Sequence, residues 1–431
     1  MPETLRQKLL PFIVETVRRS ETFAGRTVLL ALLLAATWWQ VRMAVSGDWF
    51  RSGNDMLYIL PPLRSATDEA LVGWLRGPWI GVELFAYYRP VTSVFWFTEY
   101  RVFGEQVASW QQVSVASHLG STLLLALLLT RMVGSPLAGT IGAFVWATRE
   151  KIVETLEWTP AQTDHFAAFF GILGLFLWQT FLDARGRRPS RFLLGGASLV
   201  SVLLALGSKE IAYPVPLLAA LLTLRTVRLP FRTRIALCGV WFALLTGFVG
   251  WRILAMQGIG FLPGQATPGR SQASPLTPQK WLVRMSGFLL PQVLRPTALL
   301  PFPAVLSVFA GIAAYRRWTS VRTRGVVALI AGVLFFVFMG GPECLLLSDT
   351  YTELALGLWT LTVVAFALRR EPREMAFALI WGLVAHLPLY HVVYNAAGNV
   401  TYLPGIYWGL VWSILVVALL RFVGTRSESE V

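Results

Sequence analysis

Apolar runs of about 20 residues recur along this chain, and they constrain its fold more than any other feature. Each run is long enough to cross a hydrocarbon layer of about 30 Å. A segment inside a bilayer must satisfy its backbone hydrogen bonds internally, so the runs predict helices. The chain is 55% hydrophobic and 14% charged, whereas a soluble domain is about a quarter charged. The sequence therefore predicts an all-α polytopic membrane protein.

The boundaries of the apolar runs predict about twelve transmembrane helices. The chain before them, residues 1–26, is expected to be a cytoplasmic amphipathic segment. The multispanning domain covers residues 27–421 and carries two long external loops, 46–107 and 256–297, and residues 422–431 form a cytoplasmic tail. The predicted spans are 27–45, 108–130, 136–148, 165–182, 192–207, 211–224, 235–255, 298–314, 325–341, 354–368, 375–391 and 404–421.

The basic residues are distributed in a way that predicts the orientation in the membrane. The net charge of +14 could indicate a nucleic-acid partner. However, the arginines fall in short clusters between spans, which is typical of cytoplasmic loops, so no nucleic-acid partner is expected and both termini are placed in the cytoplasm. These clusters are Arg18-Arg19, Arg185 to Arg188, Arg225 to Arg234, Arg316 to Arg324 and Arg369 to Arg373.

Polar residues on the predicted external side are the candidate catalytic and binding residues, because loops on a rigid scaffold often carry function. Asp55 follows Asn54 in the first long loop, and Asp164 opens the fourth span. Either carboxylate could instead be a solvated or helix-capping residue. Lys209 and Glu210 lie between two spans, where a local ion pair that pins two helix ends is the alternative to a functional role.

Two further observations limit the substrates and ligands that this sequence could bind. The sequence has no glycine-rich phosphate loop, nucleophile elbow or zinc signature, and no soluble nucleotide-sugar domain. A donor substrate would therefore have to be carried by the membrane itself. His118 lies inside the second span, where a lone histidine is more often a hydrogen-bonded packing residue than a ligand.

A series of short motifs resembles the multispanning GT-C glycosyltransferases, and within them the tetratricopeptide-linked O-mannosyltransferase-like branch. The order of the motifs along the chain, more than any single one, carries this resemblance. The sequence departs from the pattern at Asn54, Gln111, Ser114, Gln162 and Asn399 (or Thr350), and it lacks the tetratricopeptide tail. The matching strings are GND (53–55), YRPV (88–91), SHL (117–119), ETLEWTPAQTD (154–164), SKEIAYPVP (208–216) and TYLPG (401–405), with SDTYTELALG (348–357) a weaker match to the last motif.

The resemblance implies a membrane glycosyltransferase that moves a hexosyl or mannosyl unit from a polyprenyl-phosphate carrier to a hydroxyl acceptor. The acceptor must lose a proton as it attacks, and Asp55 is the expected base of an inverting displacement. Arg89, Lys209 and Arg295 are expected to face the donor phosphate. A divalent cation bound by Asp55 and Asp164 is an open possibility. Residues expected to position substrate or acceptor are Tyr88, His118, Glu154, Asp164, Glu210 and Tyr402.

The resemblance also implies a location, the bacterial inner membrane with an active face toward the periplasm. Two alternatives from other classes remain open at this stage. A transporter or flippase of a lipid-linked saccharide would place polar sites near the middle of the membrane. A catalytically inactive membrane scaffold would explain the departures from the motifs. Convergence of Asp55, Arg89, Glu154, Asp164 and Lys209 in one external cavity would favour the enzyme.

The predicted topology can be checked by cysteine-accessibility labelling. A cysteine at Ser65, in the first long loop, should react with a membrane-impermeant reagent in intact cells, because the Arg clusters place this loop outside. A cysteine at Arg187, in a predicted cytoplasmic loop, is the control and should react only after the membrane is opened. Protection of Ser65→Cys until the membrane is permeabilised would contradict the topology.

Overall fold

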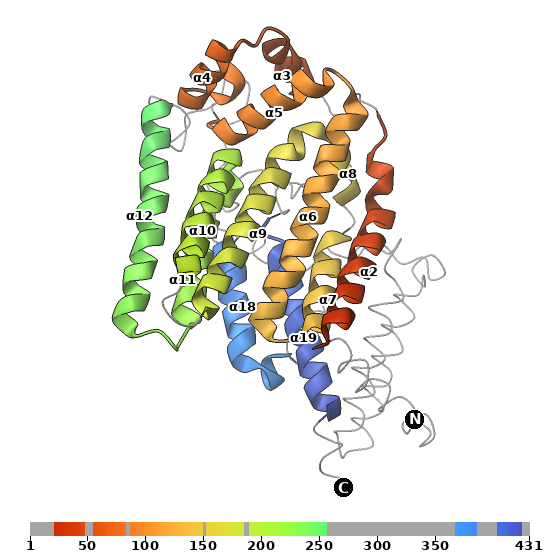
Figure 1. Ribbon diagram of the computed structural model, residues 1–431, viewed down its shortest axis with the longest axis vertical. Coiled ribbons are helices and arrows are strands. Elements are labelled where there is room, and N and C mark those ends of the chain that lie inside the picture. The colour runs from red at the N-terminus through yellow and green to blue at the C-terminus, as the bar shows by residue number, and fades with distance from the viewer. Residues whose placement is uncertain are drawn as a thin grey trace, which may run out of the picture. The chain divides into compact units, whose positions relative to one another are not determined.

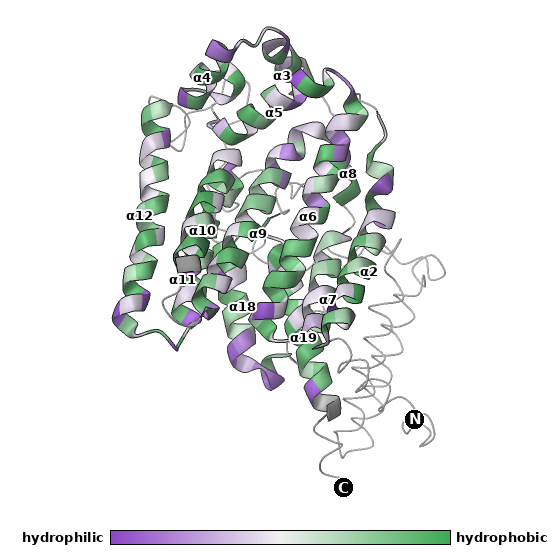
Figure 2. Ribbon diagram, in the orientation of Figure 1, coloured by the Kyte–Doolittle hydropathy of each residue, from purple (hydrophilic) through white to green (hydrophobic). Residues whose placement is uncertain are grey.

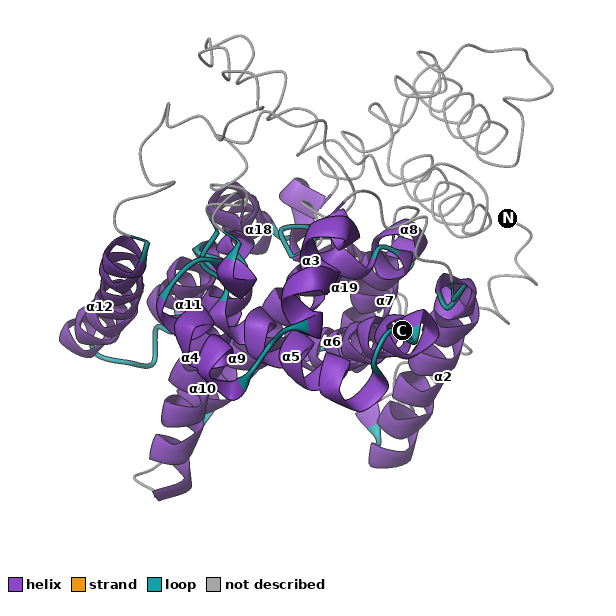
Figure 3. Ribbon diagram, turned by 90° about the horizontal axis from the view of Figure 1, so that it is seen from above, coloured by secondary structure: helices purple, strands orange, loops and turns teal. Residues whose placement is uncertain are grey.

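The computed structural model describes residues 21–47, 55–82, 87–149, 152–184, 189–256, 367–385 and 403–424. The regular elements in these ranges are all helices (Figures 1 and 3). The chain divides into two compact units, one made of Met1–Thr277 with Phe377–Val431 and one of Pro278–Ala376. Nearly all described residues belong to the first unit. The structure thus confirms the all-α class for the described part of the chain.

Five described helices are long and apolar enough to cross a membrane. They coincide with five of the predicted spans, and apolar residues run along them in Figure 2. Their windows are Phe23–Ala44 (α2, Phe23–Val41, with η1, Arg42–Ala44), Val107–Val133 (α6), Thr159–Asp183 (η5, Thr159–Ala161, with α9, Gln162–Asp183), Arg191–Ser208 (within α10, Pro189–Ser208) and Phe231–Ala255 (α12).

Other predicted spans correspond to shorter helices or lie outside the described residues. The third, sixth and twelfth predicted spans form α7 (Pro136–Ala147), α11 (Pro214–Arg225) and α19 (Ile406–Gly424). The eleventh overlaps α18 (Pro372–Ala385). The predicted spans 298–314, 325–341 and 354–368 lie outside the described residues, apart from the last two positions of the third, so the total of twelve stays a prediction.

The ends of these helices follow ordinary capping chemistry. The Thr22 side chain accepts a hydrogen bond from the Gly25 amide at the start of α2. At the turn between α6 and α7, Gly134 adopts φ +75°, a left-handed conformation that favours glycine. Ser135 then caps α7 by accepting from the Ala138 amide, and Pro136 occupies its first turn. The short connection explains why α6 and α7 are antiparallel neighbours.

Small residues allow α7 and α19 to approach closely. The Ser413 hydroxyl of α19 donates to the Ala138 carbonyl of α7 at 3.0 Å. A Cβ atom added at Gly142 would overlap the Ser413 side chain and the Gly409 backbone. Small residues at a helix crossing of this kind are common in membranes, where packing replaces the hydrophobic effect between helices.

The predicted external loop 46–107 is largely helical. It forms α3 (Asp55–Arg64), α4 (Asp68–Arg76), η3 (Trp79–Gly81) and α5 (Pro90–Phe103), here called the end layer, which lies at one end of the long helices (Figure 1). Its core is aromatic, with the Trp79 and Trp96 rings 4.9 Å apart. Phe95 stacks on Phe166 of α9 at 4.5 Å, so the end layer packs on the start of that helix.

The close approach at Gly142 predicts a specific cost of substitution. Gly142→Ala should destabilise the protein by about 1–3 kcal/mol, because the new methyl group overpacks the crossing of α7 and α19. The matched control is Gly196→Ala in α10, where nothing lies within 4 Å of the added Cβ, and where alanine should favour the helix. Thermal unfolding in detergent measures both. Equal melting temperatures for the two variants would contradict this packing.

Candidate functional site

Arg89 is held at the start of α5 by several contacts. Pro90 occupies the first turn of the helix and fixes where it begins. The buried guanidinium donates from Nη2 and Nε to Glu210 Oε2, at 2.7 and 3.1 Å, and it lies over the rings of Tyr87 and Trp79 at 4.1 and 4.8 Å. Burial alone would lower the pKa of Arg89, but the charges of Glu210, Tyr87 and Asp164 and the hydrogen bonding to Glu210 together raise it. Arg89 is therefore a fixed cation.

A second ion pair joins α9 to the segment after α10. Asp164 lies in the first turn of α9 and its side chain is 0% exposed. Lys209 Nζ donates to Asp164 Oδ2 at 2.5 Å. A negative charge in the first turn is also favoured by the helix dipole. Asp164 Oδ1 has no hydrogen-bond partner within the described ranges, so one face of this carboxylate is left unsatisfied there.

Glu210 lies between two arginines. Its Oε2 accepts from Arg89, and its Oε1 lies 3.9 Å from Nη2 of Arg252, which is in the last turn of α12. Arg252 also donates from Nη1 to the Tyr213 hydroxyl at 2.8 Å. Burial opposes ionisation of Glu210, but the charges of Arg89 and Arg252 lower its pKa below the ordinary value. Glu210 is therefore a carboxylate at neutral pH.

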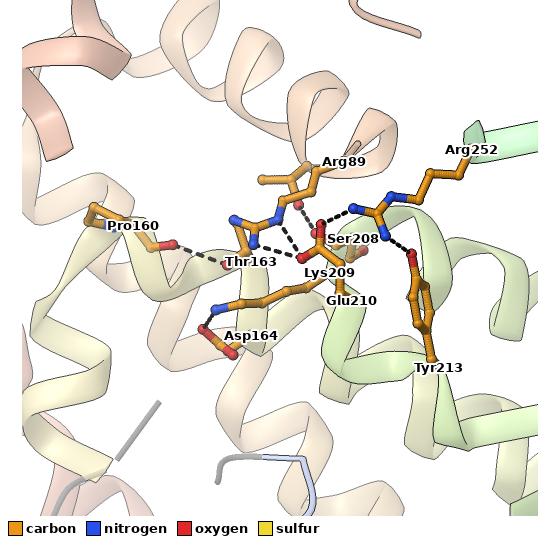
Figure 4. A network of polar contacts seen from close by, with 10 residues as sticks. Arg89, Pro160, Thr163, Asp164, Ser208, Lys209, Glu210, Tyr213 and Arg252 are labelled. Carbon is orange, nitrogen blue, oxygen red and sulfur yellow. Dashed lines mark hydrogen bonds and ion pairs between the residues drawn. The ribbon is translucent and has the colours of Figure 1, made fainter. Parts of the chain in front are cut away.

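Lys209 and Glu210 are neighbours in sequence but pair with different, distant residues (Figure 4). The Lys209 backbone is extended, with φ −162°, and the short helix η6 (Glu210–Ala212) follows it. The Thr92 hydroxyl donates to the Ser208 carbonyl at 2.9 Å and ties this segment to α5. The partners thus come from parts of the chain that are distant in sequence, and each stands at or next to the end of a helix.

The motif strings YRPV, ETLEWTPAQTD and SKEIAYPVP therefore meet in space through Arg89, Asp164, Lys209 and Glu210. Arg89 also acts electrostatically on Asp164. Sequence reasoning missed Arg252 and Tyr213. The signal for Arg252 was a charge near the end of an apolar run, a position where ionisable residues are costly and often functional.

Other predicted site residues have contacts that fit packing. The Tyr88 hydroxyl donates to the Leu75 carbonyl at 2.9 Å and accepts from Trp251 Nε1 at 2.7 Å. A ring nitrogen of His118 lies 3.0 Å from the Ala147 carbonyl, and the ring lies 5.3 Å from that of Trp146. These are the contacts that the packing alternative predicts for His118.

The remaining predicted residues are not brought into this network by the described contacts. Glu154 is exposed on α8 (Ile152–Glu157). Asp55 begins α3, but its side chain lies outside the described residues. Arg295 and Tyr402 also lie outside them. One cavity shared by Asp55, Arg89, Glu154, Asp164 and Lys209 therefore stays a prediction, and the contact that the structure shows among these residues in its described part is the pair of Asp164 and Lys209.

Two positions that depart from the family pattern have structural roles. Gln162 accepts from Trp96 Nε1 at 2.7 Å and donates to Glu99 Oε2 at 3.0 Å and to the Trp110 carbonyl at 2.8 Å. Gln111 accepts from the Gly47 amide at 2.9 Å. Each amide joins elements that are distant in sequence, so these positions are used by the fold.

The described residues include no group of three or more His, Cys, Asp or Glu side chains that is placed to bind a divalent cation. Asp164, one of the two predicted ligands, faces the ammonium of Lys209 at 2.5 Å. Arg89, Lys209 and Arg252 with Asp164 and Glu210 give three cations against two carboxylates. This balance favours an anion over a metal ion.

No family model, curated protein or solved structure matches this chain.

Glu99, which sequence reasoning also missed, predicts a pH dependence of stability. Burial raises its pKa to about 8, against a weaker opposing effect of the hydrogen bond from Gln162. A carboxyl group whose folded pKa lies above its unfolded value stabilises the fold at low pH, and this contribution is lost as the pH rises through about 8. Glu99→Gln should therefore melt at a higher temperature than the unmodified protein at about pH 9, and the difference should shrink at about pH 5.

Thermal unfolding of the detergent-solubilised protein at the two pH values measures this difference. The matched control is Glu105→Gln, which removes an exposed carboxylate whose pKa is lowered by the hydrogen bond from Arg64. Because Glu105 is ionised at both pH values, the melting difference of Glu105→Gln should be similar at about pH 5 and about pH 9. A Glu99→Gln difference that is independent of pH would show that Glu99 does not titrate in this range.

Proposed function

We propose that this protein is a GT-C-like membrane glycosyltransferase that transfers a sugar from a polyprenyl-phosphate carrier to a hydroxyl acceptor on the external face, with inversion. The observation that carries the proposal is the meeting of Arg89, Lys209 and Asp164, which come from three of the motif strings, at one end of the apolar helices. The proposal includes a fold of about twelve transmembrane helices in a bacterial inner membrane. In this proposal the end layer faces the periplasm.

The cations of the site are suited to the chemistry of a departing lipid phosphate. The phosphate gains negative charge as the sugar leaves, and fixed donors that face it lower the barrier. Arg89 is rigidly placed by two aromatic rings and an ion pair. The Lys209 side chain is 15% exposed, so it reaches the surface beside the buried Asp164. In this proposal Arg89 and Lys209 contact the phosphate, and Asp164 holds Lys209 in place.

The base in this proposal is Asp55. It begins α3, and therefore belongs to the same end layer as α5, which Arg89 precedes (Figure 1). Asp164 is less suited to deprotonate an acceptor, because its Oδ2 is already engaged by Lys209. A carboxylate within hydrogen-bond reach of the acceptor hydroxyl is the requirement that Asp55 would meet.

The positions of the charges favour an enzyme over a transporter. Lys209 and Glu210 directly follow the apolar window Arg191–Ser208, and Arg252 lies in the last turn of α12. These groups are at helix ends, whereas transporter sites lie near the middle of the membrane. An inactive scaffold is the second candidate, supported by the structural use of Gln111 and Gln162 at positions where the family pattern has other residues.

The proposal predicts different effects for two substitutions. Asp55→Asn should lower the transfer rate by about 10²–10⁴-fold and leave donor binding nearly unchanged, because a general base acts in the transition state. Arg89→Ala should weaken donor binding as well as transfer, because a phosphate-facing cation acts on both the ground and the transition state. Transfer from a radiolabelled polyprenyl-phosphate sugar in purified membranes, together with donor binding, measures both effects.

The matched control is Arg101→Ala, which removes an exposed arginine at the other end of α5 and should leave both quantities unchanged. Full activity of Asp55→Asn would exclude it as the base. The absence of transfer from every lipid donor by the unmodified protein would favour the scaffold.

A further inference from the structure

Only one of the two carboxylate oxygens of Glu210 accepts hydrogen bonds from the arginines beside it. Oε2 accepts two hydrogen bonds from Arg89, at 2.7 and 3.1 Å. Oε1 has no hydrogen-bond partner among the described residues, and its contact with Arg252 is an ion pair at 3.9 Å. A group with two or more anionic oxygens could bridge the same two guanidiniums (Figure 4).

Both guanidiniums are held in place by contacts that do not involve Glu210. Arg89 lies over the rings of Tyr87 and Trp79. Arg252 donates to the Tyr213 hydroxyl at 2.8 Å. Removal of the Glu210 carboxylate would therefore leave two positioned cations, which is the condition for binding another anion without reorganisation.

The side chain of Glu210 can move away from its ion-pair partners more easily than the side chain of Asp164 can. Its side chain is 22% exposed, whereas that of Asp164 is 0% exposed. It stands at the start of the three-residue helix η6, so a change in its side-chain rotamer breaks no long element. Asp164 is enclosed in the first turn of α9 and paired with Lys209. The two carboxylates thus differ in accessibility, because Asp164 is enclosed and Glu210 is partly exposed.

We propose that Glu210 is an exchangeable internal counter-ion, which occupies the place between Arg89 and Arg252 that a phosphate group of the ligand takes on binding. The identity of the ligand, a lipid-linked phosphate, rests on the function proposed above, but the exchange itself rests on the geometry. Arg252 then becomes a phosphate-binding residue together with Arg89. Because the ligand must displace Glu210, the charge of this residue lowers the affinity for the anion.

Binding to the full-length protein in lipid nanodiscs tests the exchange. The probes are a polyprenyl monophosphate, the uncharged polyprenol of the same length and inorganic phosphate. Glu210→Gln should bind the polyprenyl monophosphate about tenfold more tightly than the unmodified protein, as measured by the dissociation constant. Polyprenol binding should not change. Glu210→Asp, which keeps the charge, should lack the gain, and so should Glu105→Gln, which removes a surface carboxylate paired with an arginine.

A second variant keeps the test decisive if Glu210→Gln does not fold. Arg252→Gln should weaken polyprenyl monophosphate binding about tenfold, because one of the two bridging guanidiniums is lost. Its control is Arg101→Gln, which removes an exposed arginine at the far end of α5 and should leave polyprenyl monophosphate binding unchanged. The proposal would be overturned if folded Glu210→Gln binds neither polyprenyl monophosphate nor inorganic phosphate more tightly, or if Arg252→Gln binds both probes as the unmodified protein does. An equal gain in polyprenol binding would also overturn it.

The result also separates this inference from the proposed function. Sugar transfer by the unmodified protein without a gain in Glu210→Gln would leave the enzyme and reject the exchange. A gain in phosphate binding without any sugar transfer would support the exchange and reject the enzyme. A gain for inorganic phosphate alone would support the exchange with a free anion as its ligand and reject the lipid source.

Discussion

The pairing of buried charge is the constraint on which the described structure depends. Asp164 is fully enclosed at the start of an apolar helix, and an unpaired charge there would cost several kcal/mol. Lys209 is the counter-ion of Asp164 in α9, and Glu210 is the counter-ion of Arg89. Because these partners come from segments far apart in sequence, the requirement to neutralise charge also brings α5, α9, η6 and α12 together. The same contacts that hold the end layer in place assemble a group of cations.

The end layer completes this arrangement through apolar packing and amide hydrogen bonds. Trp96 of α5 packs on Trp79 and donates to Gln162 of α9. That amide also reaches Glu99 and the Trp110 carbonyl, so one side chain joins α5, α6 and α9. Loops that carry function need such support, because a cation is useful in catalysis only when its position is fixed before the substrate arrives. Arg89 has that support from the Tyr87 ring and from the Glu210 carboxylate.

The sequence predicted what depends on local composition and missed what depends on neighbours in space. The windows of α2, α6, α9, α10 and α12 follow from apolar length alone. Arg89, Asp164 and Lys209 were found because they stand in recognisable strings. The helices α3, α4 and α5 were not predicted, because they are short and their aromatic faces become meaningful only against each other and against Phe166. Arg252 was missed because it stands within an apolar run, and the bonds of Gln162 depend on two other helices, α5 and α6.

The backbone conformation of the dipeptide Lys209-Glu210 determines which ion-pair partner each of its side chains reaches. In a helix, consecutive side chains diverge by about 100°, but in an extended segment they point to opposite sides. The extended backbone at Lys209 sends its ammonium toward Asp164, while Glu210 turns toward Arg89 and Arg252. The dipeptide thus contributes a cation to one ion pair and a carboxylate to the other. Had the two residues paired with each other, Asp164 and Arg89 would both be buried without a counter-ion.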